Sequence, residues 1–201
     1  MRIWMLRHGT TAANAKRLYL GRTDEPLSAE GAAAAHEIGP SLTVRKVFVS
    51  SLRRTQETAK ILFPNAEQIV LHELREMDFG VFEGRSADDM EHDEAYRAWV
   101  DTGCTGKCPE GESMAEYAGR VCACIAEVVE QEENAGAQET VFIAHGGTLM
   151  SAFERFARPR VAYYDTIVKN LQGYTCVTAP GEDNLPFTFQ ELRRITRYGE
   201  E

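Results

Sequence analysis

Residues 1–11 read MRIWMLRHGTT, an apolar run that stops at Arg7 and His8 just before a glycine. Because Arg2 is its only polar residue, the run through Leu6 predicts a buried β-strand. In open α/β sheets, ligands bind at the carboxyl ends of the strands. A cation and an imidazole side by side at this point therefore indicate a site for a ligand.

Apolar, often β-branched segments recur along the chain and alternate with helical patterns. Strands are predicted for residues 1–6, 44–49, 68–71, 140–144, 174–178 and 187–192. Helices are predicted for residues 27–42 with Ser28 as N-cap, for 51–62 after two serines, for 86–100, and from a capping box at Ser113 to about residue 134. This alternation predicts an α/β fold, a three-layer sandwich with a mostly parallel central sheet and helices on both faces.

One stretch departs from this alternation. Residues 79–112 are acidic and punctuated by glycines, so we expect an insertion or lid over one edge of the sheet. Its acidic residues would either disfavour polyanionic substrates or form a solvated helix face; they are Asp88, Asp89, Glu91, Asp93 and Glu94. A chain of 201 residues suffices for one well-filled core, so we expect a single domain over residues 1–201.

Composition indicates a soluble globular protein, with 43% hydrophobic and 26% charged residues. No apolar run approaches the roughly 20 residues that span a bilayer, and the N-terminus does not resemble a signal peptide, so we expect a cytoplasmic protein without a membrane span. The formal net charge of -9 argues against nucleic-acid binding. The cysteines are expected to be reduced, although Cys104 and Cys108 in CTGKC could ligate a metal.

Polar residues follow four of the predicted strands, namely Arg7 with His8, then Ser50, Ser51, Arg53 and Arg54, then Glu76, and finally His145 with Gly146. The carboxyl ends of parallel strands share one edge of a sheet, so we expect these segments to meet at one rim. Two arginines and two histidines around one point form a cage for a tetrahedral dianion, because guanidinium groups match phosphate oxygens. The expected ligand is a phosphate group.

The imidazole of His8 adds a nucleophile to this cage. A neutral imidazole can attack phosphorus and form a phosphohistidine, which splits displacement by water into two easier steps. Arg7 favours the neutral form of His8 by like-charge repulsion. Glu76 is the expected proton donor to the leaving oxygen and then the base for water. Gly146 would allow close backbone approach to the phosphate, and Asn14 would add a hydrogen-bond donor.

Six segments, in chain order, resemble the motifs of the histidine phosphatase superfamily, also called the phosphoglycerate mutase-like superfamily. They are LRHGTTAAN at the nucleophile, GRTDEPLSAEG, SSLRRTQETA, LREMDFGVFEG with the acid, the loop PEGES, and IAHGGTL at the second histidine. The resemblance runs from residue 1 to about residue 150, and it is strongest to α-ribazole phosphatase-type members. Thr55 and Phe82 stand where alanine and tryptophan are common in the family.

The resemblance implies phosphoryl transfer from a small phosphate ester through a phosphohistidine on His8, with neither metal nor cofactor. The implied catalytic residues are His8, Glu76, Arg7, Arg54 and His145, and the implied substrate-binding residues are Arg7, Asn14, Gly21, Arg54, His145 and Gly146. We expect the enzyme to act as a monomer or a homodimer.

Other functions remain open from the sequence. Mutases of this family pass the phosphoryl group back to a sugar acid, but they are longer and carry inserted segments, so hydrolysis is favoured for this compact chain. A non-catalytic phosphate-binding module would need neither a nucleophile at His8 nor a proton donor at Glu76. A dinucleotide-binding domain lacks its key feature, because no G-x-G-x-x-G follows the first strand and no G-K-[ST] occurs.

Overall fold

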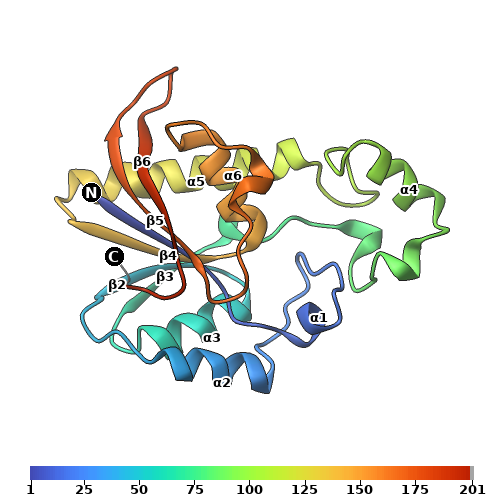
Figure 1. The fold of residues 1–201 in the computed structure, drawn as a ribbon, viewed down its shortest axis with the longest axis horizontal. Helices are drawn as coiled ribbons and strands as arrows, with labels where there is room; N and C mark the ends of the chain where they lie inside the picture. The colour runs from blue at the N-terminus through green and yellow to red at the C-terminus, as the bar shows by residue number, and fades with distance from the viewer. Residues whose placement is uncertain (200–201) are drawn as a thin grey trace.

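The central feature of the computed structural model, which describes residues 1–199, is a six-stranded sheet (Figure 1). Its strand order is β3-β2-β4-β1-β5-β6. The strands are β1 (Arg2–Arg7), β2 (Lys46–Ser50), β3 (Glu67–Leu71), β4 (Glu139–Ala144), β5 (Gly173–Pro180) and β6 (Phe187–Ile195). β1 to β4 run parallel to one another, whereas β5 is antiparallel to both β1 and β6. The prediction of a mostly parallel sheet is confirmed, with each predicted strand present and shifted by a few residues at its ends.

Helices cover both faces of this sheet (Figure 1). The α-helices are α1 (Ala12–Ala15), α2 (Ala29–Ile38), α3 (Arg53–Leu62), α4 (Glu94–Asp101), α5 (Met114–Asn134) and α6 (Gly146–Phe156). Short 3-10 helices are η1 (His72–Leu74), η2 (Gly80–Phe82), η3 (Asp88–Met90) and η4 (Tyr163–Thr166). α2 and α3 lie on one face, and α5 and α6 lie on the other. This is the three-layer α/β arrangement that the sequence predicts.

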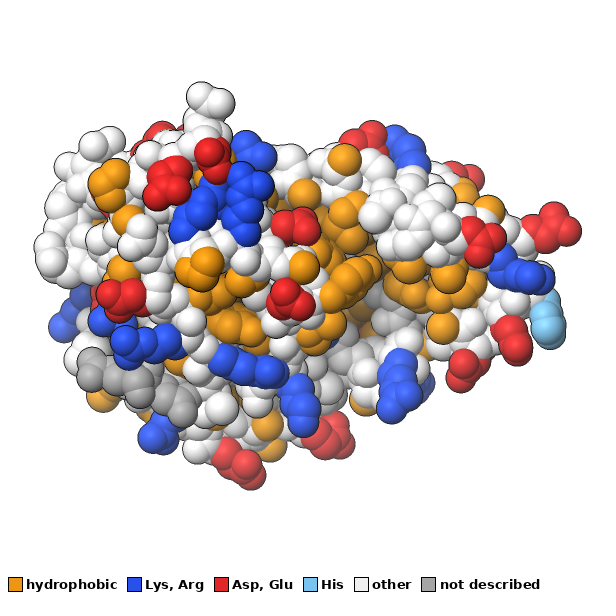
Figure 2. Space-filling model, turned by 45° about the horizontal axis from the view of Figure 1, so that its top comes forward, with side chains coloured by type: hydrophobic (Ala, Val, Ile, Leu, Met, Phe, Trp, Pro, Cys, Tyr) orange, Lys and Arg blue, Asp and Glu red, His pale blue; other side chains and the backbone are white. Residues whose placement is uncertain are grey.

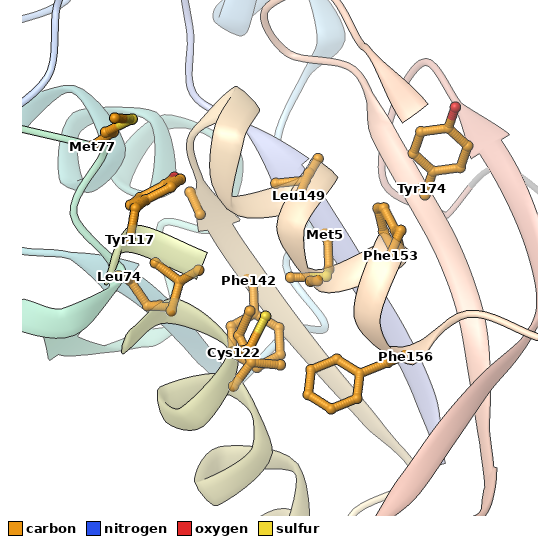
Figure 3. Close-up of a cluster of buried hydrophobic side chains, with 14 of the residues drawn as sticks. Met5, Leu74, Met77, Tyr117, Cys122, Phe142, Leu149, Phe153, Phe156 and Tyr174 are labelled. Carbon is orange, nitrogen blue, oxygen red and sulfur yellow. The ribbon is translucent and has the colours of Figure 1, made fainter. Parts of the chain in front are cut away.

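Alternating side chains of β1 build the core on each face, as expected for a strand with a side-chain period of two. Trp4 and Leu6 pack in the buried cluster under α2 and α3. Ile3 and Met5 belong to the larger cluster under α5 and α6. Figure 3 shows Met5 with aromatic and aliphatic side chains of α5, α6 and β4 in this second cluster. Burial on both faces explains why the β1 sequence is almost entirely apolar.

Two helix starts agree with the sequence. Ser28 caps α2, because its Oγ accepts the Gly31 N–H at 3.0 Å. Ser113 opens α5 with a capping box in which its Oγ accepts the Glu116 N–H and the Glu116 carboxylate accepts the Ser113 N–H. These caps need only local partners, which is why the sequence predicts them well.

Two predicted helices differ from the structure. α3 begins at Arg53 with Leu52 at the N-cap position, so neither preceding serine is the cap. The helix predicted for residues 86–100 is wrong as one element, since the chain forms η3 and then α4. Asp93 divides them, because its Oδ1 accepts the N–H groups of Ala95 and Tyr96 and thereby starts a new helix.

The segment of residues 79–112 carries η2, η3 and α4, and it extends away from the sheet beyond the carboxyl end of β1 (Figure 1). Trp99 of α4 packs against Phe82, with ring centroids 5.5 Å apart, and both side chains belong to the larger buried cluster that contains Met5. Among residues 1–199, the helices are too short or too polar to cross a membrane.

Candidate active site

His8 follows β1 and is almost completely buried, with 3% of its surface exposed. Its Nδ1 lies 2.6 Å from the carbonyl oxygen of Gly9. A carbonyl can only accept, so Nδ1 carries the proton of the neutral ring and Nε2 keeps a free lone pair. The backbone therefore sets the tautomer that leaves Nε2 available as a nucleophile.

The charge state of His8 favours the same role. Burial lowers the pKa of His8 well below its ordinary value, and Arg54 and Arg7 lower it further by like-charge repulsion. The sequence predicts the effect of Arg7, whereas burial and Arg54 contribute more. His8 is therefore a neutral imidazole at physiological pH.

Arg54 reaches the site from the first turn of α3 and is completely buried. Its Nη1 and Nη2 donate to the carbonyl oxygens of Thr23 and Gly21 at 2.9 and 2.7 Å, and its Nε donates to His145 Nδ1 at 3.4 Å. These three contacts fix the plane of the guanidinium. The neighbouring Arg53 is exposed and pairs with Glu57, so it takes no part in the cage.

The loop around Gly21 holds Arg54 in place. A Cβ at residue 21 would lie 1.9 Å from the carbonyl oxygen of Met77, so glycine is required by close backbone approach. The Glu83 carboxylate accepts the N–H groups of Gly21 and Arg22 at 3.0 and 2.9 Å. Gly21 thus has a clear positioning role toward Arg54, beyond the substrate contact that the sequence resemblance implies.

Arg7 lies at the end of β1, where Nη1 donates to the carbonyl oxygen of Val168 at 2.9 Å. Its Nε is buried and has no hydrogen-bond partner within residues 1–199. A buried guanidinium N–H without an acceptor costs free energy unless an anion binds to it. A phosphate oxygen at this position would accept that proton.

His145 and α6 close another side of the cage. The His8 and His145 rings lie edge to face, with centroids 5.2 Å apart. His145 occupies the N-cap position of α6, so the free N–H groups and positive end of this helix begin at Gly146, next to the Arg7 guanidinium. This helix, which the sequence analysis does not predict, adds a second source of positive potential for an anion.

Glu76 lies between η1 and η2, and its carboxylate faces the first turn of α6. Its Oε1 accepts the Met77 N–H at 3.0 Å, and its Oε2 faces the Gly147 N–H at 3.4 Å. The backbone before it is clamped by Arg120 of α5, which donates to the carbonyl oxygens of Arg75 and Glu76 at 2.8 and 2.9 Å. The Glu76 carboxylate is therefore oriented by neighbours distant in the sequence.

Glu112, in the PEGES loop, links this loop to α5 and to the segment that follows Glu76. It forms a salt bridge with Arg120 at 2.7 Å, and its second oxygen accepts the Asp78 N–H at 2.9 Å. Arg120 and Glu112 together tie α5 and the end of residues 79–112 to the segment that carries Glu76. No local pattern predicts the role of Arg120, because its partners on the Glu76 segment lie more than 40 residues away.

Asn14 and Asn170 form hydrogen bonds just beyond the carboxyl end of β1. Asn170 Nδ2 donates to the carbonyl oxygen of His8 at 2.9 Å and faces Asn14 Oδ1 at 3.3 Å. Asn14 Oδ1 also accepts the Thr11 N–H at 3.2 Å, which leaves its amide N–H groups to face a ligand. The sequence predicts Asn14 but misses Asn170, which lies in the C-terminal quarter outside the recognisable motifs.

A pocket of about 310 Å³ lies beside Glu76. Arg7, Glu76 and Gly147 line its inner end, and the remaining lining is mostly aromatic or methionine: Tyr19, Met77, Phe79, Trp99, Met114, Tyr117, Met150, Tyr163 and Tyr164. We call it the apolar pocket. Figure 2 shows hydrophobic side chains around a hollow between the main body of the molecule, which contains the sheet, and the smaller part on the right, which contains α4. An alcohol leaving group beside Glu76 would lie in these surroundings.

The proposed cysteine metal site finds no support in the geometry. Across residues 1–199, groups of three or more His, Cys, Asp or Glu side chains suited to a metal ion are absent. Burial raises the pKa of Cys108 to about 12, which keeps this thiol protonated and a poor ligand. All five cysteines are free. Around a bound phosphate, the Arg7 and Arg54 guanidinium groups and the positive end of α6 supply positive charge.

Comparisons with known proteins agree with this geometry. Residues 3–184 match the profile of the histidine phosphatase superfamily, branch 1. The chain belongs to the histidine phosphatase superfamily. Proteins named probable phosphoglycerate mutase GpmB, from Enterobacter sp. strain 638 and Salmonella arizonae, are each 33% identical over 153 residues, which cover 73% of this chain and 70% of theirs.

Solved structures of this superfamily have the same fold along the whole chain. An Escherichia coli K-12 protein assigned as an α-ribazole-5′-P phosphatase is 26% identical with a TM-score of 0.84, covering 100% of this chain and 99% of its own. The α-ribazole phosphatase from Shigella flexneri is 27% identical with a TM-score of 0.79 and full coverage of both chains. This histidine phosphatase superfamily member is therefore an enzyme of the phosphatase class.

Proposed function

We propose that this histidine phosphatase is a metal-independent phosphomonoesterase that acts through a phosphohistidine on His8. The observation that carries the proposal is the state of His8, a buried neutral imidazole whose Nδ1–H is held by Gly9 and whose Nε2 is free. Arg7 and Arg54 supply guanidinium donors for phosphate oxygens, and the His145 ring lies edge to face with His8. Such donors stabilise the charge of a transferring phosphoryl group.

In the first step, His8 Nε2 forms a bond to phosphorus while the bond from phosphorus to the alcohol oxygen breaks. Glu76, in its acid form, gives its proton to that oxygen, so the leaving group departs as a neutral alcohol. Arg7 and Arg54 hold the non-bridging oxygens. The product is phosphohistidine with Glu76 as a carboxylate.

In the second step, the Glu76 carboxylate takes a proton from a water molecule, whose oxygen bonds to phosphorus as the bond to Nε2 breaks. Inorganic phosphate leaves, and both His8 and protonated Glu76 are restored. The hydrogen bonds from Met77 and Gly147 keep the carboxylate in one place throughout. Glu76 thus serves both steps without moving.

The substrate is proposed to be a small phosphorylated metabolite with an aromatic or apolar alcohol, and α-ribazole 5′-phosphate is the specific candidate. The aromatic lining of the apolar pocket supports a flat ring beside the scissile bond. The two phosphatase neighbours support the same compound by analogy. A role in cobalamin biosynthesis and a cytoplasmic location follow from this proposal, and the free thiols are consistent with a reducing compartment.

The test is release of inorganic phosphate, in the presence of EDTA, from α-ribazole 5′-phosphate, nucleoside monophosphates, sugar phosphates and 3-phosphoglycerate. We expect release by the wild type and by His36→Ala, a matched change of an exposed histidine on α2. His8→Ala should release none and should form no acid-labile phosphoenzyme. Strict dependence on added magnesium, or equal activity of His8→Ala, would contradict the mechanism.

A mutase is the second candidate, and the GpmB relatives are the observation that favours it. A mutase must hold a glycerate carboxylate close to the phosphate, whereas the apolar pocket beside Glu76 presents rings and thioethers. Exchange of label between phosphoglycerates without phosphate release would favour the mutase. Phosphate binding with neither reaction would favour a non-catalytic module.

A further inference from the structure

A large cleft beside the apolar pocket is strongly basic. It has a volume of about 1000 Å³ and is lined by segments around α1, by the turn after η4 and by β6. Its charged lining residues are Arg7, Arg17, Lys169 and Arg194, and among the described residues no carboxylate lines it. We call it the basic cleft. Four cations without an acid are unexpected in a chain whose net charge is -9.

Three of these cations have no role in the proposed mechanism. Arg17 and Lys169 are exposed and form no salt bridge within residues 1–199, while Arg194 donates to the amide oxygen of Gln172 at 3.2 Å. Elsewhere on the surface, arginines such as Arg22, Arg53 and Arg85 pair with carboxylates. Cations left free in a cleft are available to an anionic ligand.

The backbone at Arg17 provides an independent observation. α1 ends in a Schellman motif, in which the N–H of Leu18 bonds to the carbonyl oxygen of Ala13 at 3.0 Å and the N–H of Arg17 bonds to that of Asn14 at 3.1 Å. The residue at this position is usually glycine, yet here Arg17 has a φ of 56°. An arginine is kept where glycine would be less strained, which fits a use for its side chain in the cleft.

The basic cleft adjoins the active site. Arg7 and Tyr19 line both this cleft and the apolar pocket, so the two cavities share these side chains as walls, and Arg7 also belongs to the phosphate cage. A volume of this size accommodates an organic ligand, and it exceeds what a lone phosphate needs. A substrate whose phosphate contacts Arg7 therefore has the basic cleft in its immediate surroundings.

We propose that the basic cleft is a subsite for a second anionic group of the substrate, a phosphate or a carboxylate, held by Arg17, Lys169 and Arg194. The inference rests on the proposed phosphomonoesterase function. It favours esters with a distal anion over α-ribazole 5′-phosphate, whose scissile phosphate is its single anionic group. Within the described chain, Ala87 is the one residue of segment 79–112 that lines the cleft, so the acidic residues of that segment do not line it.

Two acidic residues of segment 79–112, Asp89 and Asp93, bond to partners within the segment itself. Asp89 accepts hydrogen bonds from Ser86, and Asp93 pairs with Arg85 at 2.8 Å and caps α4. Asp89 and Asp93 are therefore paired within the segment, which agrees with the solvated helix face that the sequence left open.

The test compares esters that differ only in the distal group. One pair is 4-carboxyphenyl phosphate with 4-carbamoylphenyl phosphate, and the other is adenosine 3′,5′-bisphosphate with adenosine 5′-monophosphate, following release of the 5′-phosphate. The ratio of kcat/KM for the anionic over the neutral member is measured in each variant. Comparing ratios between variants cancels any intrinsic difference in leaving-group quality.

The variant is Arg17→Asn/Lys169→Gln, because asparagine tolerates the left-handed conformation at residue 17. The matched control is Lys16→Gln/Arg193→Gln, which removes the same charge from neighbouring residues that do not line the cleft. We expect the ratio to fall about fivefold in the cleft variant, through KM, and less than about twofold in the control. Thermal unfolding of both variants checks that each is folded.

A fall in either ratio supports the subsite, and the pair with the larger fall identifies the distal group as carboxylate or phosphate. An unchanged ratio in both pairs, or an equal fall in the control, overturns it. The same esters are also titrated calorimetrically into the His8→Ala protein, which does not turn them over. This titration gives the corresponding ratio of dissociation constants for the anionic and neutral members of each pair. If no ester is hydrolysed by the wild type, the proposed function fails, while the titration still decides the subsite.

Discussion

His145 Nε2 lies 2.9 Å from Ser50 Oγ, so the last residue of β2 holds the second histidine of the cage. Arg54 Nε–H faces the other ring nitrogen, Nδ1, at 3.4 Å. A guanidinium can only donate, so Nδ1 accepts and Nε2 donates to Ser50. Ser50 then donates to Thr55 Oγ1 at 3.0 Å, and Thr55 donates to the carbonyl oxygen of Leu52 at 2.9 Å. One chain of hydrogen bonds thus fixes the tautomer of His145.

Thr55→Val should lower kcat/KM about tenfold, because Ser50 loses the acceptor for its proton and the His145 ring loses its fixed orientation. Thr55→Ser keeps the hydroxyl and should retain most of the activity. Steady-state kinetics, with thermal unfolding to confirm the fold, is the measurement. Wild-type activity in Thr55→Val would show that this chain of hydrogen bonds does not position His145.

Glu76→Gln should affect esters according to their leaving groups. The glutamine oxygen can still accept the Met77 N–H at 3.0 Å, whereas the longer contact with the Gly147 N–H, at 3.4 Å to the other carboxylate oxygen, is lost. Most of the local structure should persist. Without a proton donor, alkyl phosphates should lose about 10²- to 10⁴-fold in kcat/KM. 4-Nitrophenyl phosphate should lose far less in the phosphorylation step, since its leaving group needs little protonation. Equal losses for both kinds of ester would remove Glu76 from the role of acid.

Stability should fall as the pH is lowered through about 6.5. Burial, followed by Arg54, lowers the pKa of both His8 and His145 well below the ordinary value of 6.5. Below that value the unfolded chain binds protons that the folded protein does not, so unfolding is favoured as the pH falls. Each histidine should cost about 1 kcal/mol of unfolding free energy between pH 7.5 and 5.5.

Urea denaturation at the two pH values measures this effect. The variant His8→Asn/His145→Gln should show a smaller pH-dependent loss than the wild type, because neither replacement titrates. An identical loss in both proteins would mean that the histidines do not have the lowered pKa values that their burial implies.

Gly147→Ala should reduce activity more than stability. A Cβ at residue 147 would lie 2.7 Å from Glu76 Oε1 and 2.9 Å from Tyr117 Oη, so the carboxylate must move. We expect kcat/KM to fall about tenfold or more. Gly119→Ala on α5 is the matched change, since a Cβ there has no neighbour within 4 Å.

The Gly119→Ala variant should keep its activity and gain about 0.5–1 kcal/mol in unfolding free energy, because alanine is a better helix former. Kinetics and chemical denaturation of the two variants give both quantities. A fully active Gly147→Ala protein would show that Glu76 has more freedom than its close contacts indicate.

Much of the fold can be predicted from local pattern. The strand predicted for residues 1–6 matches β1 (Arg2–Arg7) within one residue, because a strand buried on both faces has an almost entirely apolar sequence. The caps at Ser28 and Ser113 are predicted because their partners lie three residues away. The helix expected at residues 86–100 fails, since the hydrophobic pattern does not show that Asp93 starts a second helix.

The sequence by itself determined the chemistry of the site: His8, Arg7, Arg54, Glu76 and His145 all follow predicted strands, and parallel strands bring their carboxyl ends to one rim. Tertiary structure alone decided how these groups are held. Long-range hydrogen bonds and packing set the tautomers of both histidines, the clamp of Arg120 on the Glu76 segment and the separation of an apolar pocket from a basic cleft. The physical reason is that orientation and burial depend on contacts between residues far apart in the chain, which no local spacing encodes.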